Sequence, residues 1–129
     1  MNKKIGYTKS TDKSVDYVKR VLQEEFRKEG FVPMFDLDMK NTANEKLSEN
    51  FTQYYILGYY NISYAISAIE KNPNAGLLIP TVLVLYEING IRYLSGTEPT
   101  NIDSLSEDME SFITQIDNII KSVIDNAIG

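Results

Sequence analysis

The sequence predicts an α+β domain in which helices pack on one face of a curved, mainly antiparallel sheet of about five strands. Strand-like and helix-like segments follow one another with almost no surplus residues, in the order β-α-β-α-β-α-β-β-α. The dipeptide Asn89-Gly90 lies between two apolar runs, which is the strongest short-range signal for an antiparallel hairpin. A sheet with such a hairpin and alternating helices is expected to carry its helices on one face. We expect residues 1–129 to form a single domain.

The first third of the chain predicts a strand, a helix and a second strand. Residues 5–9 alternate as a strand does, and the next apolar residues recur at helical spacing: Val15, Val18, Leu22 and Phe26. Gly30 follows this stripe at the position where a left-handed residue commonly ends a helix. Residues 31–38 have the composition of a strand, and Pro33 near its start indicates an edge strand or a bulge.

The middle of the chain carries helix-start signals on either side of an aromatic strand. Thr42 and Glu45 have the spacing of a capping box, which predicts a short helix. Residues 54–60 form an aromatic-rich strand, and Asn61 is expected to cap the helix that follows. The turn-forming residues 72–76 end that helix.

The last third predicts a hairpin and a long helix. Residues 77–88 are the longest strand candidate, and their continuous apolar character implies burial on both faces, or on one face with a subunit contact on the other. Residues 91–95 return as the partner strand. Ser104 and Glu107 form a second capping box, and residues 104–127 carry the broad apolar stripe of an amphipathic helix.

The composition excludes several classes of chemistry. Cysteine, histidine and tryptophan are absent, so a disulfide, a thiolate nucleophile and a Cys/His zinc site cannot form. Any general base would have to be Asp, Glu, Lys or Tyr. The net charge of −5 disfavours nucleic-acid binding through bulk electrostatics. We expect no cofactor.

The targeting signals that the chain lacks favour a soluble, cytoplasmic protein. The N-terminus has no apolar stretch of the roughly 7–15 residues that a signal peptide needs. The longest apolar run, residues 76–86, is too short for a membrane span and contains Pro80. We therefore expect no association with membranes.

Three blocks of the sequence resemble the domain-of-unknown-function 302 (DUF302) family. The blocks are Asp38-x-x-x-Thr42-x-x-Glu45-Lys46-Leu47, Tyr54-x-Ile56-Leu57-Gly58-x-x-Asn61 and Gly76-Leu77-Leu78-Ile79-Pro80. The resemblance covers about residues 5–99 and leaves the amphipathic helix at about 104–127 outside it. It implies a compact α+β fold and self-association, but no substrate. Tyr60 and Thr81 stand where the family usually has cysteine, so any thiol chemistry of other members does not carry over.

A ligand site is expected where the family blocks meet. Its candidate residues are Asp38, Lys46, Tyr60, Asn61 and Thr81. The free backbone amides at the helix start could hold a small anion, the lysine would attract it, and the tyrosine could stack on it or donate a hydrogen bond. The simpler alternatives are that Asn61 is only a helix cap and that Lys46 forms an exposed pair with Glu49.

Two rival functions remain open. An enzyme could work through the Asp38 carboxylate, perturbed by its surroundings, and the Tyr60 hydroxyl in a small cleft. Asp36 and Asp38 share one face of a strand, which suits a carboxylate pair or a shallow cation site, although such residues more often solvate an edge or cap a helix. Alternatively, the dense tyrosines of residues 54–64 bury against another chain, because tyrosine is enriched at interfaces. A homodimer is the expected assembly.

Overall fold

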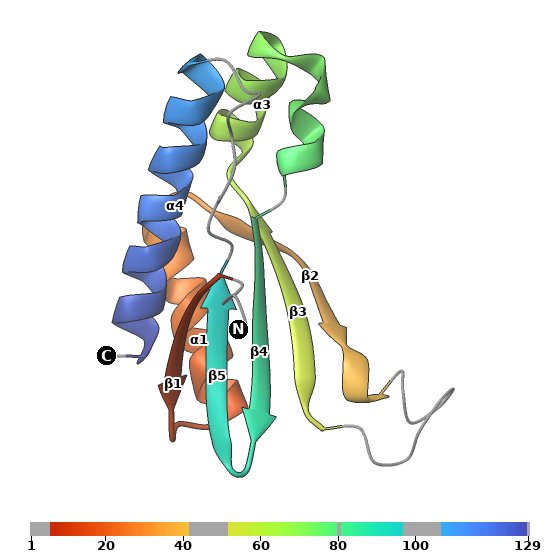
Figure 1. Cartoon of the computed structure of the whole chain (residues 1–129), viewed down its shortest axis with the longest axis vertical. Helices are drawn as coiled ribbons and strands as arrows, with labels where there is room; N and C mark the ends of the chain where they lie inside the picture. The colour runs from red at the N-terminus through yellow and green to blue at the C-terminus, as the bar shows by residue number, and fades with distance from the viewer. Residues whose placement is uncertain (1–5, 42–51, 80, 97–106, 129) are drawn as a thin grey trace, which may run out of the picture.

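The computed structural model describes residues 6–41, 52–79, 81–96 and 107–128. Within these residues, five antiparallel strands form one sheet in the order β1-β5-β4-β3-β2; in Figure 1 the long helix α1 lies behind the strands and α4 runs beside them, along the left of the view. The elements are β1 (Tyr7–Thr11), α1 (Val15–Lys28), β2 (Val32–Asp38), β3 (Tyr54–Tyr60), α3 (Ile62–Lys71), the 3-10 helix η1 (Pro73–Leu78), β4 (Thr81–Ile88), β5 (Ile91–Gly96) and α4 (Glu107–Ile128). The predicted α+β class, with helices on one face of an antiparallel sheet, is confirmed.

Helix α1 begins and ends at the predicted signals. The Ser14 side chain accepts a hydrogen bond from the backbone N–H of Tyr17, which satisfies one free donor of the first turn. All four residues of the predicted apolar stripe are buried. Gly30 follows the helix with a φ of 81°, a conformation that costs glycine little because it has no Cβ.

The edge strand β2 carries the predicted irregularity near Pro33. The pairing of β2 with β3 shifts between Pro33 and Phe35, so Met34 is one residue more than β3 can match. Proline lacks the N–H of a sheet ladder and is therefore tolerated at an edge or a bulge, and here both occur together.

The hairpin between β4 and β5 has the predicted turn. Asn89 and Gly90 both have positive φ, 52° and 83°, as a type I′ turn requires. The turn sets the register of the two strands, in which Ile88 pairs with Ile91 and Tyr86 with Tyr93.

The prediction that residues 77–88 form one strand is wrong at its start. Leu77 and Leu78 belong to η1, and β4 begins only at Thr81. The Asn72 side chain caps η1 by accepting a hydrogen bond from the Asn74 N–H, and Pro73 suits the first turn because it needs no donor there. Leu77 is 87% exposed, so apolar character alone did not mark a buried strand.

Helix α4 packs closely on β5 because Gly96 has no side chain. A Cβ at Gly96 would lie 2.5 Å from Ile120 Cγ2 and 2.9 Å from Ile124 Cδ1. The buried residues of α4 join those of α1, of the helix-facing strand positions and of the connection between α1 and β2 in one core: Val15, Val18, Leu22, Phe26, Phe31, Leu57, Tyr59, Leu83, Leu85, Leu94, Ile120, Val123, Ile124 and Ala127.

The predicted capping boxes at Thr42 and Ser104 lie outside the described residues, as does the short helix expected after Thr42. Within the part of the chain that the structure describes, no helix is both long and apolar enough to cross a membrane.

Candidate functional site

Three of the five predicted site residues lie together. Tyr60, Asn61 and Thr81 line a small cavity where β3 runs into α3, with Phe31 and Tyr64 among its other walls. Its volume is about 20 Å³. A buried water needs roughly 10–15 Å³, so this cavity suits one water molecule.

Asn61 uses both polar atoms of its side chain within the fold. Its Oδ1 accepts a hydrogen bond from the Tyr64 N–H at 3.2 Å, which is the predicted helix cap. Its Nδ2 donates to the Glu29 carbonyl at 3.1 Å and thereby ties the start of α3 to the end of α1. Gly30 makes room for this contact, since a Cβ there would lie 2.9 Å from Nδ2. Asn61 therefore has a structural role that accounts for its position.

Asp38 lies far from this cavity, so the expectation that it converges with Tyr60 and Asn61 is wrong. Because β2 and β3 are antiparallel, Asp38 pairs with Tyr55, at the opposite end of β3 from Tyr60. Tyr55 and Tyr60 are five residues apart on β3, which corresponds to about 17 Å along an extended strand. The Asp38 side chain is exposed, and its Oδ1 accepts a hydrogen bond from the Asn41 N–H at 3.0 Å.

Asp36, the second carboxylate considered in the sequence, is held in an ion pair within the fold. Asp36 pairs with the Lys19 ammonium at 2.7 Å, which ties β2 to α1. Lys46 lies outside the described residues. Among the residues that the structure describes, no group of three or more acidic, histidine or cysteine side chains could hold a metal ion.

One whole face of the sheet is without charged side chains among the described strand residues. Residues that pair across strands share a face, so the register assigns each strand position to a side. We call the side away from α1 and α4 the open face; its residues are Thr8, Ser10, Val32, Phe35, Leu37, Tyr54, Ile56, Gly58, Tyr60, Val82, Val84, Tyr86, Ile88, Ile91, Tyr93 and Ser95. The charged strand residues all lie on the helix side: Lys9, Asp36, Asp38, Glu87 and Arg92.

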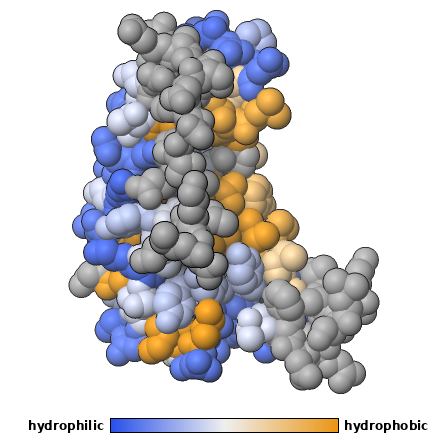
Figure 2. Space-filling model, in the orientation of Figure 1, coloured by the Kyte–Doolittle hydropathy of each residue, from blue (hydrophilic) through white to orange (hydrophobic). Residues whose placement is uncertain are grey.

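Aromatic rings dominate the centre of the open face. The rings of Tyr54, Tyr86 and Tyr93 stack across β3, β4 and β5, with centroids 5.5 Å and 5.4 Å apart. We call these three residues the tyrosine ladder. Beside it, the Phe35 ring lies over Gly58, where a Cβ would come within 2.4 Å of the ring. Figure 2, in the same orientation as Figure 1, shows apolar residues gathered toward β2 and β3 and again near the β4–β5 turn.

The dense tyrosines of residues 54–64 predicted an interface, but they include only part of this surface. Tyr86 and Tyr93 could have been found, because a two-residue turn at Asn89-Gly90 places them opposite each other. Tyr59, in contrast, points to the helix side and is buried against Phe26, with ring centroids 4.2 Å apart.

Comparison with known proteins agrees with the fold and identifies a family. A crystal structure of an uncharacterized conserved DUF302 protein from Bacillus stearothermophilus superposes with a TM-score of 0.87. The alignment covers 97% of this chain and 99% of that chain at 20% sequence identity, a level that supports the shared fold alone. No curated protein matches the chain. The family model for the domain of unknown function DUF302 matches residues 7–127, beyond the 5–99 of the sequence blocks, and the chain belongs to the DUF302 family.

Proposed function

We propose that this protein is a cytoplasmic, non-catalytic interaction module that binds a second copy of itself through the open face. The observation that carries the proposal is the division of charge across the sheet. Every charged residue of the described strands faces the helices, and the opposite side offers tyrosine, isoleucine, valine and phenylalanine. The cytoplasmic location rests on sequence features only.

An uncharged sheet face is unusual for a surface that stays in water. Antiparallel sheets with one solvated face normally alternate between apolar residues toward the core and polar residues toward solvent. The cores of protein interfaces, however, are depleted in charged residues and enriched in aromatic ones. Burying the open face removes no charge from water, so it avoids the large desolvation cost of ionised groups.

The chemistry of this face favours a second copy as the partner. A twofold interface requires a surface that is complementary to itself. Each copy has a net charge of −5, so two charged faces would repel, but two uncharged faces meet without like-charge contacts. Two sheets that pack face to face lie about 10 Å apart, and their side chains interdigitate. The stacked tyrosines of one copy could interdigitate with the open-face side chains of the other in this way.

The size of the open face is adequate for a stable dimer. Five strands spaced about 4.8 Å apart and about 20 Å long give roughly 500 Å² before the relief of the side chains is counted. A standard interface buries about 800 Å² of accessible surface on each partner. The open face is of this order.

The enzyme hypothesis receives no comparable support. It requires Asp38 in a desolvated cleft beside Tyr60. Asp38 is instead exposed, and it lies beside Tyr55, at the opposite end of β3 from Tyr60. Binding of a small anion beside Tyr60, Asn61 and Thr81 would need more room than a cavity of about 20 Å³ gives.

Substitution of Val84 at the centre of the open face tests the proposal. We expect the wild-type chain to sediment as a dimer, and Val84→Lys to sediment as a monomer because it would bury an ammonium group in the interface. The measurement is sedimentation velocity over a concentration series. Circular dichroism of the variant checks that the fold survives.

A matched control adds the same charge elsewhere. Ser122→Lys places a lysine on an exposed position of α4 and should leave the dimer intact. A wild-type chain that stays monomeric at the highest concentration, or a Val84→Lys variant that is folded and still dimeric, would contradict the proposal.

A further inference from the structure

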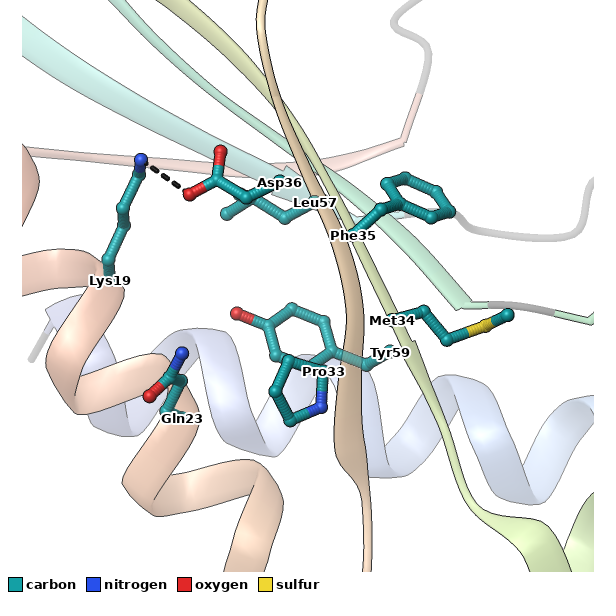
Figure 3. A pocket seen from close by; sticks show the side chains of 8 residues that line it. All are labelled: Lys19, Gln23, Pro33, Met34, Phe35, Asp36, Leu57 and Tyr59. Carbon is teal, nitrogen blue, oxygen red and sulfur yellow. Dashed lines mark hydrogen bonds and ion pairs between the residues drawn. The ribbon is translucent and has the colours of Figure 1, made fainter.

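A hollow of about 210 Å³ lies between α1 and the edge strand β2. Figure 3 shows Lys19 and Gln23 of α1 on one side of it and Asp36 of β2 on the other, with the Tyr59 hydroxyl between them. Lys19 and Gln23 are four residues apart and therefore neighbours on one helix face. The hollow is on the helix side of the sheet, so it is separate from the open face.

The bulge in β2 borders the hollow. The side chains of Met34 and Phe35 extend to the other side of the strand in Figure 3, so these residues border the space with their backbone. Met34 is the extra residue of the bulge, and a bulge bends the strand that carries it. Leu57 and Pro33 add apolar surface.

The Tyr59 hydroxyl is a fixed polar group at the floor of the hollow. Tyr59 is only 3% exposed, and its ring is held against Phe26 with centroids 4.2 Å apart. Its hydroxyl projects toward Lys19 and Gln23 and makes no hydrogen bond to another described residue. Burial, and secondarily the charge of Asp36, raises the pKa of Tyr59 to about 12, so the group is a neutral donor at physiological pH.

The charges around the hollow cancel. The Lys19 ammonium lies 2.7 Å from an Asp36 carboxylate oxygen and 3.6 Å from the centroid of the Tyr55 ring. Because these opposite charges offset each other, an ion in the hollow gains little net attraction in return for its lost hydration, whereas an uncharged molecule has no such desolvation cost. Gln23 adds an amide that can both donate and accept.

We propose that this hollow binds an uncharged molecule with a single ring, whose polar substituent accepts a hydrogen bond from the Tyr59 hydroxyl. A cavity of about 150 Å³ holds benzene, so about 210 Å³ holds one ring with a small polar substituent. A rigid ring also loses less conformational freedom on binding than a flexible chain does. The polar substituent contacts Tyr59 and Gln23, and the ring lies on Pro33 and Leu57.

A pair of probes with one shape and different charge tests the inference. Nicotinamide is uncharged, and nicotinate has the same ring with an anionic carboxylate. In NMR titrations of the full chain, nicotinamide should shift the backbone amides of Gln23 and Asp36 saturably in the millimolar range, and nicotinate should bind about tenfold more weakly. Tyr59→Phe should weaken nicotinamide about fivefold, because it removes one neutral hydrogen bond.

Two exposed positions on α1 provide a blocking variant and its control. Gln23→Trp places an indole in the hollow and should abolish nicotinamide binding, whereas Glu24→Trp, at the adjacent exposed position, should leave it unchanged. Absence of saturable nicotinamide binding, equal binding of nicotinate, or binding that survives Gln23→Trp would each overturn the inference. Val84→Lys should keep nicotinamide binding, so failure of the dimer and failure of this site can be told apart.

Discussion

Single residues in this chain have roles that follow from a few polar contacts, and Asn61 is the clearest example. The Asn61 side chain caps α3 and also donates a hydrogen bond to the carbonyl of Glu29, the residue that follows α1. The two ends it joins are 32 residues apart in sequence. A residue that looks like a ligand-binding asparagine by family position thus has both of its polar groups occupied.

Asn61→Ala should lower the free energy of unfolding by about 1–2 kcal/mol, because it removes a helix cap and a second hydrogen bond. Asn61→Ser keeps a capping oxygen and loses only the donor to Glu29, so it should cost less than alanine does. Urea unfolding curves measure both values. If the alanine and serine variants were equally stable, the cap would not be the main contribution.

Local signals explain why some residues were predictable and others were not. The cap at Asn61, the left-handed Gly30 and the Asn89-Gly90 turn depend on residues within a few positions, so the sequence predicts them correctly. The position of Asp38 depends on the direction in which β2 pairs with β3. Antiparallel pairing places the end of β2 beside the start of β3, and therefore away from Asn61.

At the scale of elements, the fit between α4 and β5 depends on one missing side chain. Gly96 lets Ile120 and Ile124 approach the strand backbone more closely than any Cβ would allow. The helix stripe was predictable from its spacing, but the partner strand was not, because the two elements meet only through the tertiary fold.

Gly96→Ala should destabilise the protein by about 1–3 kcal/mol through overpacking between α4 and β5. Gly76→Ala is the control, since a Cβ there meets nothing within 4 Å, and it should change the stability by less than about 0.5 kcal/mol. Thermal unfolding of the two variants gives the comparison. Equal melting temperatures would show that α4 can move away from β5 at little cost.

Only part of the tyrosine ladder could be predicted from the sequence. The Tyr86–Tyr93 pair follows from the hairpin turn between them, but Tyr54 joins through the pairing of β3 with β4, across the intervening α3 and η1. The error at Leu77 and Leu78 has a related cause. Apolar residues in a 3-10 helix and in a strand look alike over such a short run.

At the scale of the whole molecule, Tyr59 couples the stability of the fold to alkaline pH. Its pKa is raised from 10.0 to about 12 in the folded chain, chiefly by burial. The folded state therefore holds this proton more tightly than the unfolded state does. The associated stability is fully present below pH 10 and is lost as the pH rises toward 12.

Tyr59→Phe should remove this part of the pH dependence. Over that alkaline range the wild-type chain should lose roughly 2–3 kcal/mol more stability than the phenylalanine variant, whose other tyrosines are the same. Urea unfolding at a series of alkaline pH values measures the difference. Parallel curves for the two proteins would mean that the Tyr59 hydroxyl ionises as readily in the folded chain as in the unfolded one.

The placement of charged residues on one side of the sheet also affects how the strands reach their native register during folding. Shifting any strand by one residue would exchange its two sides, turning Tyr86 or Tyr93 inward and Glu87 or Arg92 outward. A slipped β4 or β5 would lose the ion pair between Glu87 and Arg92, whose side chains approach to 3.5 Å, and would crowd large rings beneath the helices. The same alternation that leaves one side free of charge therefore penalises misaligned intermediates during folding.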